Sequence, residues 1–64
     1  MQTGKVKFFN NTKGFGFIND HATGKDVFVH STGLIDNIHE GDEVTFEIEE
    51  GKKGPNAVQV RRAS

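Results

Sequence analysis

Residues 13–18, KGFGFI, decide the fold, because an extended chain here is apolar on both of its faces. Side chains alternate along a β-strand, so Phe15 and Phe17 share one face while Ile18 lies on the other. Glycine precedes and separates the two rings, which predicts that no neighbouring side chain obstructs a flat group lying on them. One face of this strand therefore carries aromatic rings.

Residues 27–30, VFVH, repeat this arrangement, with two valines on one face and Phe28 and His30 on the other. Aliphatic residues alone suffice for the core of a small barrel, and the predicted core is Val6, Ile18, Val27, Val29, Val44, Ile48, Val58 and Val60. Adding every phenylalanine would overfill that core. We therefore predict one shared outer face for Phe8, Phe15, Phe17 and Phe28, and soluble proteins rarely expose such a group without a use for it.

Glycine and asparagine interrupt the chain at the spacing expected of a small barrel or sandwich. Five segments are predicted to be strands: residues 5–10, 14–19, 26–30, 43–49 and 57–61. Residues 50–56 predict a turn, and Leu34, Ile35 and Ile38 predict a helical turn inside a loop. Five short strands without a full helix predict an all-β fold, a closed antiparallel barrel, as one domain over residues 1–64.

The composition limits the class of protein. The chain has 64 residues, 33% of them hydrophobic, and no cysteine. No apolar run approaches the roughly 20 residues of a membrane span, and no charged-then-apolar leader begins the chain. Absence of cysteine is typical of a reducing compartment. We therefore expect a soluble, cytoplasmic domain that does not interact with a membrane.

Charge is unevenly distributed, although the net charge is only −1. Residues 1–19 contain three lysines and no acid, whereas residues 36–50 contain seven acids and no base. Lys5, Lys7 and Lys13 border the strands that carry the rings. Lysines beside aromatic side chains suit single-stranded nucleic acid, because its backbone is anionic and its bases have flat apolar faces.

A second hypothesis is a protein-interaction barrel, which uses the aromatic face for a partner or for a second copy of the chain in a homodimer. Protein interfaces tend to exclude lysine from their centre. The alternation of lysine with exposed rings therefore favours nucleic acid, and we expect a monomer.

The residues needed for catalysis or metal binding are not grouped in this sequence. His21, His30 and His39 fall nine residues apart, which matches no ligand cluster, and no cysteine completes a site. Neither Ser31 nor Ser64 lies in a nucleophile elbow, and the glycines lack the Gly-Lys-Ser/Thr ending of a P-loop. We expect no enzyme, metal, cofactor or small-molecule substrate.

Residues 13–18 resemble the first ribonucleoprotein motif of the bacterial cold-shock protein family, and residues 27–30 resemble the second. Further matches at residues 5–10, 40–46 and 54–57 extend the resemblance over roughly residues 3–61. It implies a five-stranded oligonucleotide-binding barrel, or OB-fold, that binds single-stranded RNA and DNA. Family members of this size act in the cold stress response as RNA chaperones and transcription antiterminators.

The resemblance also implies nucleic-acid-binding roles for ten residues, as stacking rings, basic contacts and polar groups near the bases. These are Lys7, Phe8, Phe9, Asn10, Lys13, Phe15, Phe17, Asp26, Phe28 and His30. The sequence departs from the common pattern at Phe8, where tryptophan is usual, and at Ser31, where phenylalanine is frequent. The segment 31–40 is also about four residues short. These departures predict fewer stacking subsites.

Overall fold

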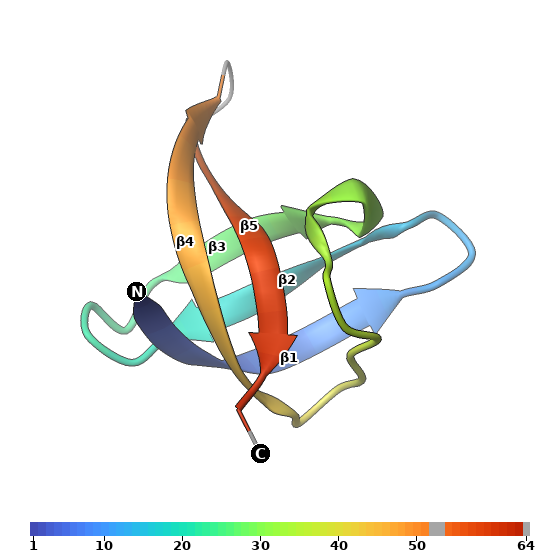
Figure 1. Ribbon diagram of the computed structural model, residues 1–64, viewed down its shortest axis with the longest axis horizontal. Coiled ribbons are helices and arrows are strands. Elements are labelled where there is room, and N and C mark those ends of the chain that lie inside the picture. Colours follow the sequence, from blue (N-terminus) through green and yellow to red (C-terminus); the bar gives the residue numbers. More distant parts are fainter. Residues whose placement is uncertain (52–53, 64) are drawn as a thin grey trace.

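The computed structural model describes residues 1–51 and 54–63 and is built almost entirely of strands (Figure 1). In chain order the elements are β1 (Gln2–Asn10), β2 (Phe15–Asp20), β3 (Asp26–His30), η1 (Ser31–Gly33), β4 (Glu43–Gly51) and β5 (Gly54–Arg62). All five predicted strands are present. A helical turn is also present, as the 3-10 turn η1. It ends at Gly33, just before Leu34, Ile35 and Ile38, from which the turn was predicted.

The five strands close into a barrel in the order β1-β2-β3-β5-β4. Neighbouring strands are antiparallel except β3 and β5, which run parallel. Strand directions cannot alternate all the way round a closed ring with an odd number of strands, so one neighbouring pair has to be parallel. The predicted closed five-stranded barrel is confirmed, and this single parallel pair completes it.

The core lies inside the barrel and contains Val6, Ile18, Val27, Val29, Ile38, Val44, Phe46, Ala57 and Val60. Most of the predicted aliphatic core is confirmed. The prediction is wrong for Ile48, which is 37% exposed, and for Val58, which is only half-buried. Phe46 and Ala57 are buried instead.

A bulge in β5 explains why Val58 faces outward. The register of β4 and β5 shifts because one residue of β4 lies opposite two residues of β5. Gln59 lies in this bulge and has a φ of 51°, in the left-handed region. An extra residue breaks the alternation of side chains, so Ala57 and Val60 both point inward although they are three positions apart.

The exposure of Ile48 follows from the shape of the β4–β5 hairpin. Figure 1 shows the outer end of this hairpin projecting past the rest of the barrel, and Ile48 lies in the half of β4 that leads to this end. The two strands also continue further than predicted, with Gly51 paired to Gly54. The predicted turn over residues 50–56 is therefore much shorter than expected, and residues 52 and 53 of it lie outside the described residues.

One phenylalanine belongs to the core because a glycine makes room for its ring. Phe46 is 1% exposed. A Cβ atom on Gly4 would lie 3.1 Å from Phe46 Cε1 and 2.8 Å from Ile18 Cγ2, so only glycine leaves space there.

Across the described residues, the structure contains no helix with the length and apolar character that crossing a bilayer requires.

Candidate nucleic-acid interface

The outer face of the β1–β2–β3 sheet carries its aromatic side chains in two rows that run across the strands. The first row consists of the register partners Asn10, Phe15 and His30. The second row consists of the register partners Phe8, Phe17 and Phe28. Because partners on neighbouring strands point to the same side of a sheet, each row forms a continuous strip.

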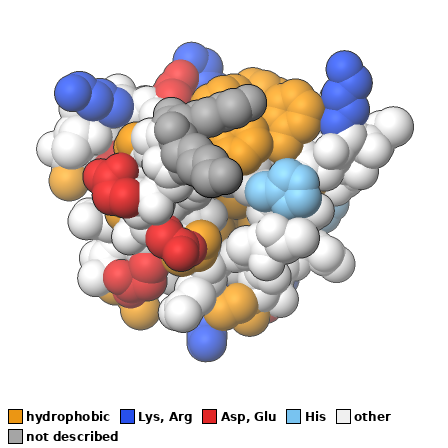
Figure 2. Space-filling model, turned by 90° about the horizontal axis from the view of Figure 1, so that it is seen from above, with side chains coloured by type: hydrophobic (Ala, Val, Ile, Leu, Met, Phe, Trp, Pro, Cys, Tyr) orange, Lys and Arg blue, Asp and Glu red, His pale blue; other side chains and the backbone are white. Residues whose placement is uncertain are grey.

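The rings of Phe8, Phe15, Phe17 and Phe28 form a closed group of four, which we call the platform. Phe15 and Phe28 are stacked at 6.0 Å between ring centroids, while Phe17 and Phe28 meet edge to face at 5.8 Å. Phe8 lies 5.5 Å from Phe17 and 6.3 Å from Phe15. The predicted shared outer face is confirmed, and Figure 2 shows apolar side chains gathered in one patch with basic and histidine side chains beside it.

A bulge at Lys7 places Phe8 on the platform. Val6 pairs with Ile18 and Phe8 pairs with Phe17, so β1 has one more residue than β2 over this interval. Strict alternation would have put Val6 and Phe8 on the same face. The extra residue instead leaves Val6 in the core and turns Phe8 outward, where it is 36% exposed.

Phe9 does not join the platform, because it points to the other side of β1 and packs against the core as a half-buried residue. Its register partner is Gly16. A Cβ atom on Gly16 would collide with the Phe8 carbonyl oxygen and lie 2.7 Å from Phe9 Cδ1. The expectation that this glycine clears the outer face of the rings is therefore wrong, since its missing side chain makes room for Phe9 inside.

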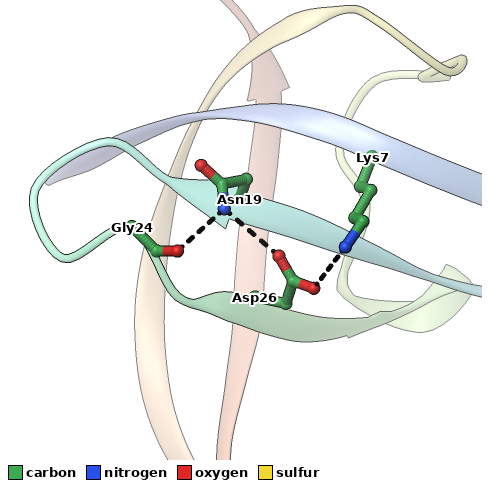
Figure 3. Close-up of polar contacts among 4 residues, drawn as sticks. All are labelled: Lys7, Asn19, Gly24 and Asp26. Carbon is green, nitrogen blue, oxygen red and sulfur yellow. Dashed lines mark hydrogen bonds and ion pairs between the residues drawn. The ribbon is translucent and has the colours of Figure 1, made fainter.

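A polar row follows the two aromatic rows, with Lys5, Asn19 and Asp26 as register partners on β1, β2 and β3. Lys7 Nζ donates to Asp26 Oδ2 at 3.0 Å, and Asn19 Nδ2 donates to Asp26 Oδ1 at 3.2 Å and to the Gly24 carbonyl at 3.0 Å (Figure 3). The hydrogen bond from Lys7, followed by that from Asn19, lowers the pKa of the Asp26 carboxyl. The carboxylate is therefore ionised at neutral pH.

Asn10 and Lys13 lie at the turn between β1 and β2. Asn10 Oδ1 accepts the backbone N–H of Lys13 at 3.0 Å, and the Asn10 carbonyl accepts the N–H of Gly14 at 2.7 Å. Gly14 has a φ of 73°, which glycine adopts without strain. Within residues 1–51 and 54–63, no carboxylate oxygen lies within 4.0 Å of the exposed Lys13 ammonium, so its charge faces solvent.

His30 ends β3 and caps η1, with Nδ1 accepting the Thr32 N–H at 3.2 Å. A neutral imidazole that accepts at Nδ1 carries its proton on Nε2. The turn therefore orients this exposed ring at the end of the first row and leaves it a donor on its other nitrogen.

Two asparagines beside the platform were not predicted as site residues. Asn19 lies two positions after Phe17 and therefore on the same face of the strand, so the alternation of side chains could have predicted its place beside the rings. Asn56 pairs with Phe28 through the parallel β3–β5 contact, which no local pattern indicates. Together with His30, Asn56 and Phe28 line a shallow groove of about 420 Å³ next to the rings.

The histidines are separated from one another. His21 Nε2 lies 2.8 Å from Glu43 Oε1, and His39 Nδ1 lies 3.8 Å from Asp42 Oδ2. In the part of the chain that the structure describes, no three metal-ligating side chains come together in a way that would hold an ion.

Comparison with known proteins agrees with this geometry. Residues 2–63 match the family described as the 'Cold-shock' DNA-binding domain. The chain is 55% identical to cold shock protein CspD of Bacillus subtilis over 64 residues, covering 94% of this chain and 96% of the relative. It is 52% identical to cold shock-like protein CspA of Vibrio cholerae over 62 residues, covering 91% and 89%. The chain belongs to the cold-shock domain family of nucleic-acid-binding proteins.

Proposed function

We propose that this protein binds single-stranded RNA and DNA by stacking bases on the platform, and that it acts as an RNA chaperone and transcription antiterminator in cold adaptation. The observation that carries the proposal is the contact of four phenylalanine rings on one outer face. Each base stacked on an aromatic side chain contributes about 1–3 kcal/mol. A platform of this size can therefore hold a short run of bases.

The polar residues around the rings support the same function. Lys13 at the β1–β2 turn supplies positive charge next to the rows, where the backbone of a bound strand passes. The Lys7 side chain lies beside the second row, and its ammonium is paired with Asp26. Asn10 and Asp26 offer polar atoms to base edges at the two ends of the sheet. Phe9 acts from inside, because its packing on the core supports the strand that carries Phe8.

Binding is selective for single strands. A duplex hides the faces of its bases in its own stack, and only splayed bases reach an aromatic side chain. The protein works as a monomer in this proposal, because a second copy on the platform would cover the rings that bind the bases. The cytoplasm suits this role, since RNA is made and folded there and the chain has no cysteine.

Chaperone action follows from binding alone and uses no nucleotide hydrolysis. A protein that binds only open strands stabilises them by RT ln(1 + [L]/Kd), which is about 2.7 kcal/mol at a hundredfold excess over Kd. That free energy opens marginal hairpins, terminator hairpins among them, and leaves long helices closed. The cold shock names of the relatives support the assignment to cold adaptation.

The test is a titration of fluorescently labelled single-stranded oligonucleotides and matched duplexes at two salt concentrations. The chain has no tryptophan or tyrosine, so the label has to be on the nucleic acid. Phe15→Ala, Phe17→Ala and Phe28→Ala should each weaken single-strand binding by about 1–3 kcal/mol. Ile48→Ala is the matched control, because Ile48 is as exposed as Phe8 and lies outside the platform.

Far-UV circular dichroism confirms that each variant is folded before its affinity is measured. Folded platform variants that bind as tightly as the parent would contradict the proposal. Loss of self-association in the same variants, without any binding of single strands by the parent, would favour the protein-interaction barrel.

A further inference from the structure

The ion pair between Lys7 and Asp26 crosses a whole strand. Lys7 belongs to β1 and Asp26 to β3, and β2 lies between them in the sheet. Their charged atoms are nevertheless 3.0 Å apart, so the long side chain of Lys7 reaches over the outer face of β2 (Figure 3). The pair lies at the edge of the second aromatic row, on the side where the polar row begins.

Asn19 holds the carboxylate of this pair in place. It occupies the middle strand, and its amide group donates to Asp26 Oδ1 and to the carbonyl of Gly24 in the following turn. Both oxygens of Asp26 are therefore engaged, one by an amide and the other by the Lys7 ammonium. A neutral amide orients the carboxylate without adding a positive charge, so Asp26 keeps its negative charge opposite Lys7.

This pairing changes the number of cations that a bound strand meets. Three lysines border the aromatic rows, namely Lys5, Lys7 and Lys13. Among the described residues, only Lys7 of these three has a carboxylate oxygen within 4.0 Å. Opposite charges 3.0 Å apart present little net charge to a phosphate group farther away.

Resting on the proposed function, we propose that Asp26, positioned by Asn19, neutralises Lys7, so that this ion pair adds no net charge to the attraction of the nucleic-acid backbone. The lowered pKa of Asp26 agrees with a carboxylate that stays charged at neutral pH. The protein thereby lowers its own affinity and salt dependence while keeping every stacking ring. Weak electrostatic binding allows a strand to leave, as a chaperone requires.

The experiment measures the affinity for a short labelled oligothymidylate as a function of salt. For binding to a single strand, the slope of log K against log salt becomes more negative by about 0.7 for each phosphate that a protein cation neutralises. Asp26→Asn, which keeps the shape of the side chain, should therefore steepen the slope by about 0.7 and tighten binding at low salt. Between 50 and 200 mM salt this adds about a 2.5-fold loss of affinity, from the same relation.

Two further variants identify the cation responsible. Adding Lys7→Gln to Asp26→Asn should return the salt slope to the value of the parent, because Lys7 is the charge that Asp26→Asn releases. Lys13→Gln should flatten the slope by about 0.7 in both backgrounds, since no described carboxylate pairs with Lys13. Asp26→Ser repeats the test with a smaller neutral side chain, so the result does not depend on one variant.

The positioning role of Asn19 has its own measurement. Asn19→Ala should raise the titration midpoint of the Asp26 carboxyl carbon, followed by nuclear magnetic resonance, because one hydrogen bond to the charged form is lost. An unchanged midpoint would refute that role.

The outcomes separate this inference from the proposed function. A parent protein that binds no single strand at all contradicts the proposed function. A parent that binds through its rings, but whose salt slope does not steepen with Asp26→Asn, contradicts only the neutralisation of Lys7. Weaker binding by Asp26→Asn at low salt also overturns the inference, because any contact of Asp26 with the bases would then outweigh its neutralisation of Lys7.

Discussion

The carboxyl group of Asp26 links the site to the pH dependence of stability. Lys7 and Asn19 both donate to it in the folded protein, which lowers its pKa below the ordinary aspartate value of about 3.9. A group whose pKa is lower in the folded than in the unfolded state binds fewer protons when folded. Its contribution to stability is therefore present above the unfolded pKa and is lost as the pH falls through the folded pKa.

Asp26→Asn removes this acid-sensitive contribution. The variant should lose less stability than the parent when the pH is lowered through the acid range below about 4, because asparagine does not titrate. Urea unfolding followed by far-UV circular dichroism at a series of pH values measures the difference. Lys7→Gln should also reduce the loss of stability at acid pH, since Lys7 is the main cause of the lowered pKa of Asp26. Equal acid sensitivity in parent and Asp26→Asn would show that the pair contributes nothing.

At the scale of single residues, the sequence predicts part of the site. The period of two and the limited core volume place Phe15, Phe17 and Phe28 outside, and the structure agrees. Phe8 and Phe9 depend on the bulge at position 7, and alternation alone cannot place a bulge. Strict alternation from the buried Val6 would put Phe8 inside and Phe9 outside, the reverse of what the structure shows.

Gln59 makes the bulge in β5 a feature that can be tested. A residue other than glycine costs about 1–2 kcal/mol in the left-handed region, while glycine costs about 0.5–1 kcal/mol in lost chain entropy. Gln59 has a φ of 51°, so it carries the cost of a residue other than glycine in this region. Gln59→Gly should therefore raise the free energy of unfolding by up to about 1.5 kcal/mol, measured by urea unfolding.

A β-branched residue is the matched comparison at this position. Gln59→Val should destabilise the protein, because valine tolerates a positive φ poorly. If Gln59→Gly is instead less stable than the parent, the left-handed conformation of Gln59 carries no measurable strain.

At the scale of elements, the presence of each strand is predicted well, whereas the ends of β4 and β5 are not. The strand Asp26–His30 is found at its predicted bounds, because acidic and loop residues flank an apolar run. β4 and β5 run further, since their hairpin projects past the core and its pairing needs no apolar pattern. Ile38 is buried from a loop without periodicity, which no pattern of strands or helices could show.

The whole molecule should melt nucleic-acid hairpins less effectively than a barrel with a fuller set of rings. Phe8 is smaller than tryptophan, and Ser31 is exposed beside the β1–β2 turn, where its N–H donates to the Gly14 carbonyl at 2.8 Å. Larger rings at both positions would widen the platform. Phe8→Trp combined with Ser31→Phe should lower the protein concentration that half-opens a molecular-beacon hairpin by about fivefold or more, from at least 1 kcal/mol of added stacking.

Ile48→Phe is the control for that variant, because it adds an exposed ring outside the platform. It should leave the opening concentration at the parent value. If the double variant folds and opens the hairpin no better than this control, ring number does not limit melting. An unopened hairpin at saturating parent protein, despite binding to an unstructured strand, would make the protein a passive binder.

All four rings of the platform come from β1–β3, whereas β4 and β5 supply Val44, Phe46, Ala57 and Val60 to the core. Hairpins close in sequence form sooner than the distant β1–β4 and β3–β5 contacts, which carry a larger loop-closure entropy. A nascent β1–β3 sheet therefore exposes its binding surface before the barrel closes. A nucleic-acid strand that stacks there would stabilise the unfinished sheet, so we expect a bound single strand to assist the folding of the protein.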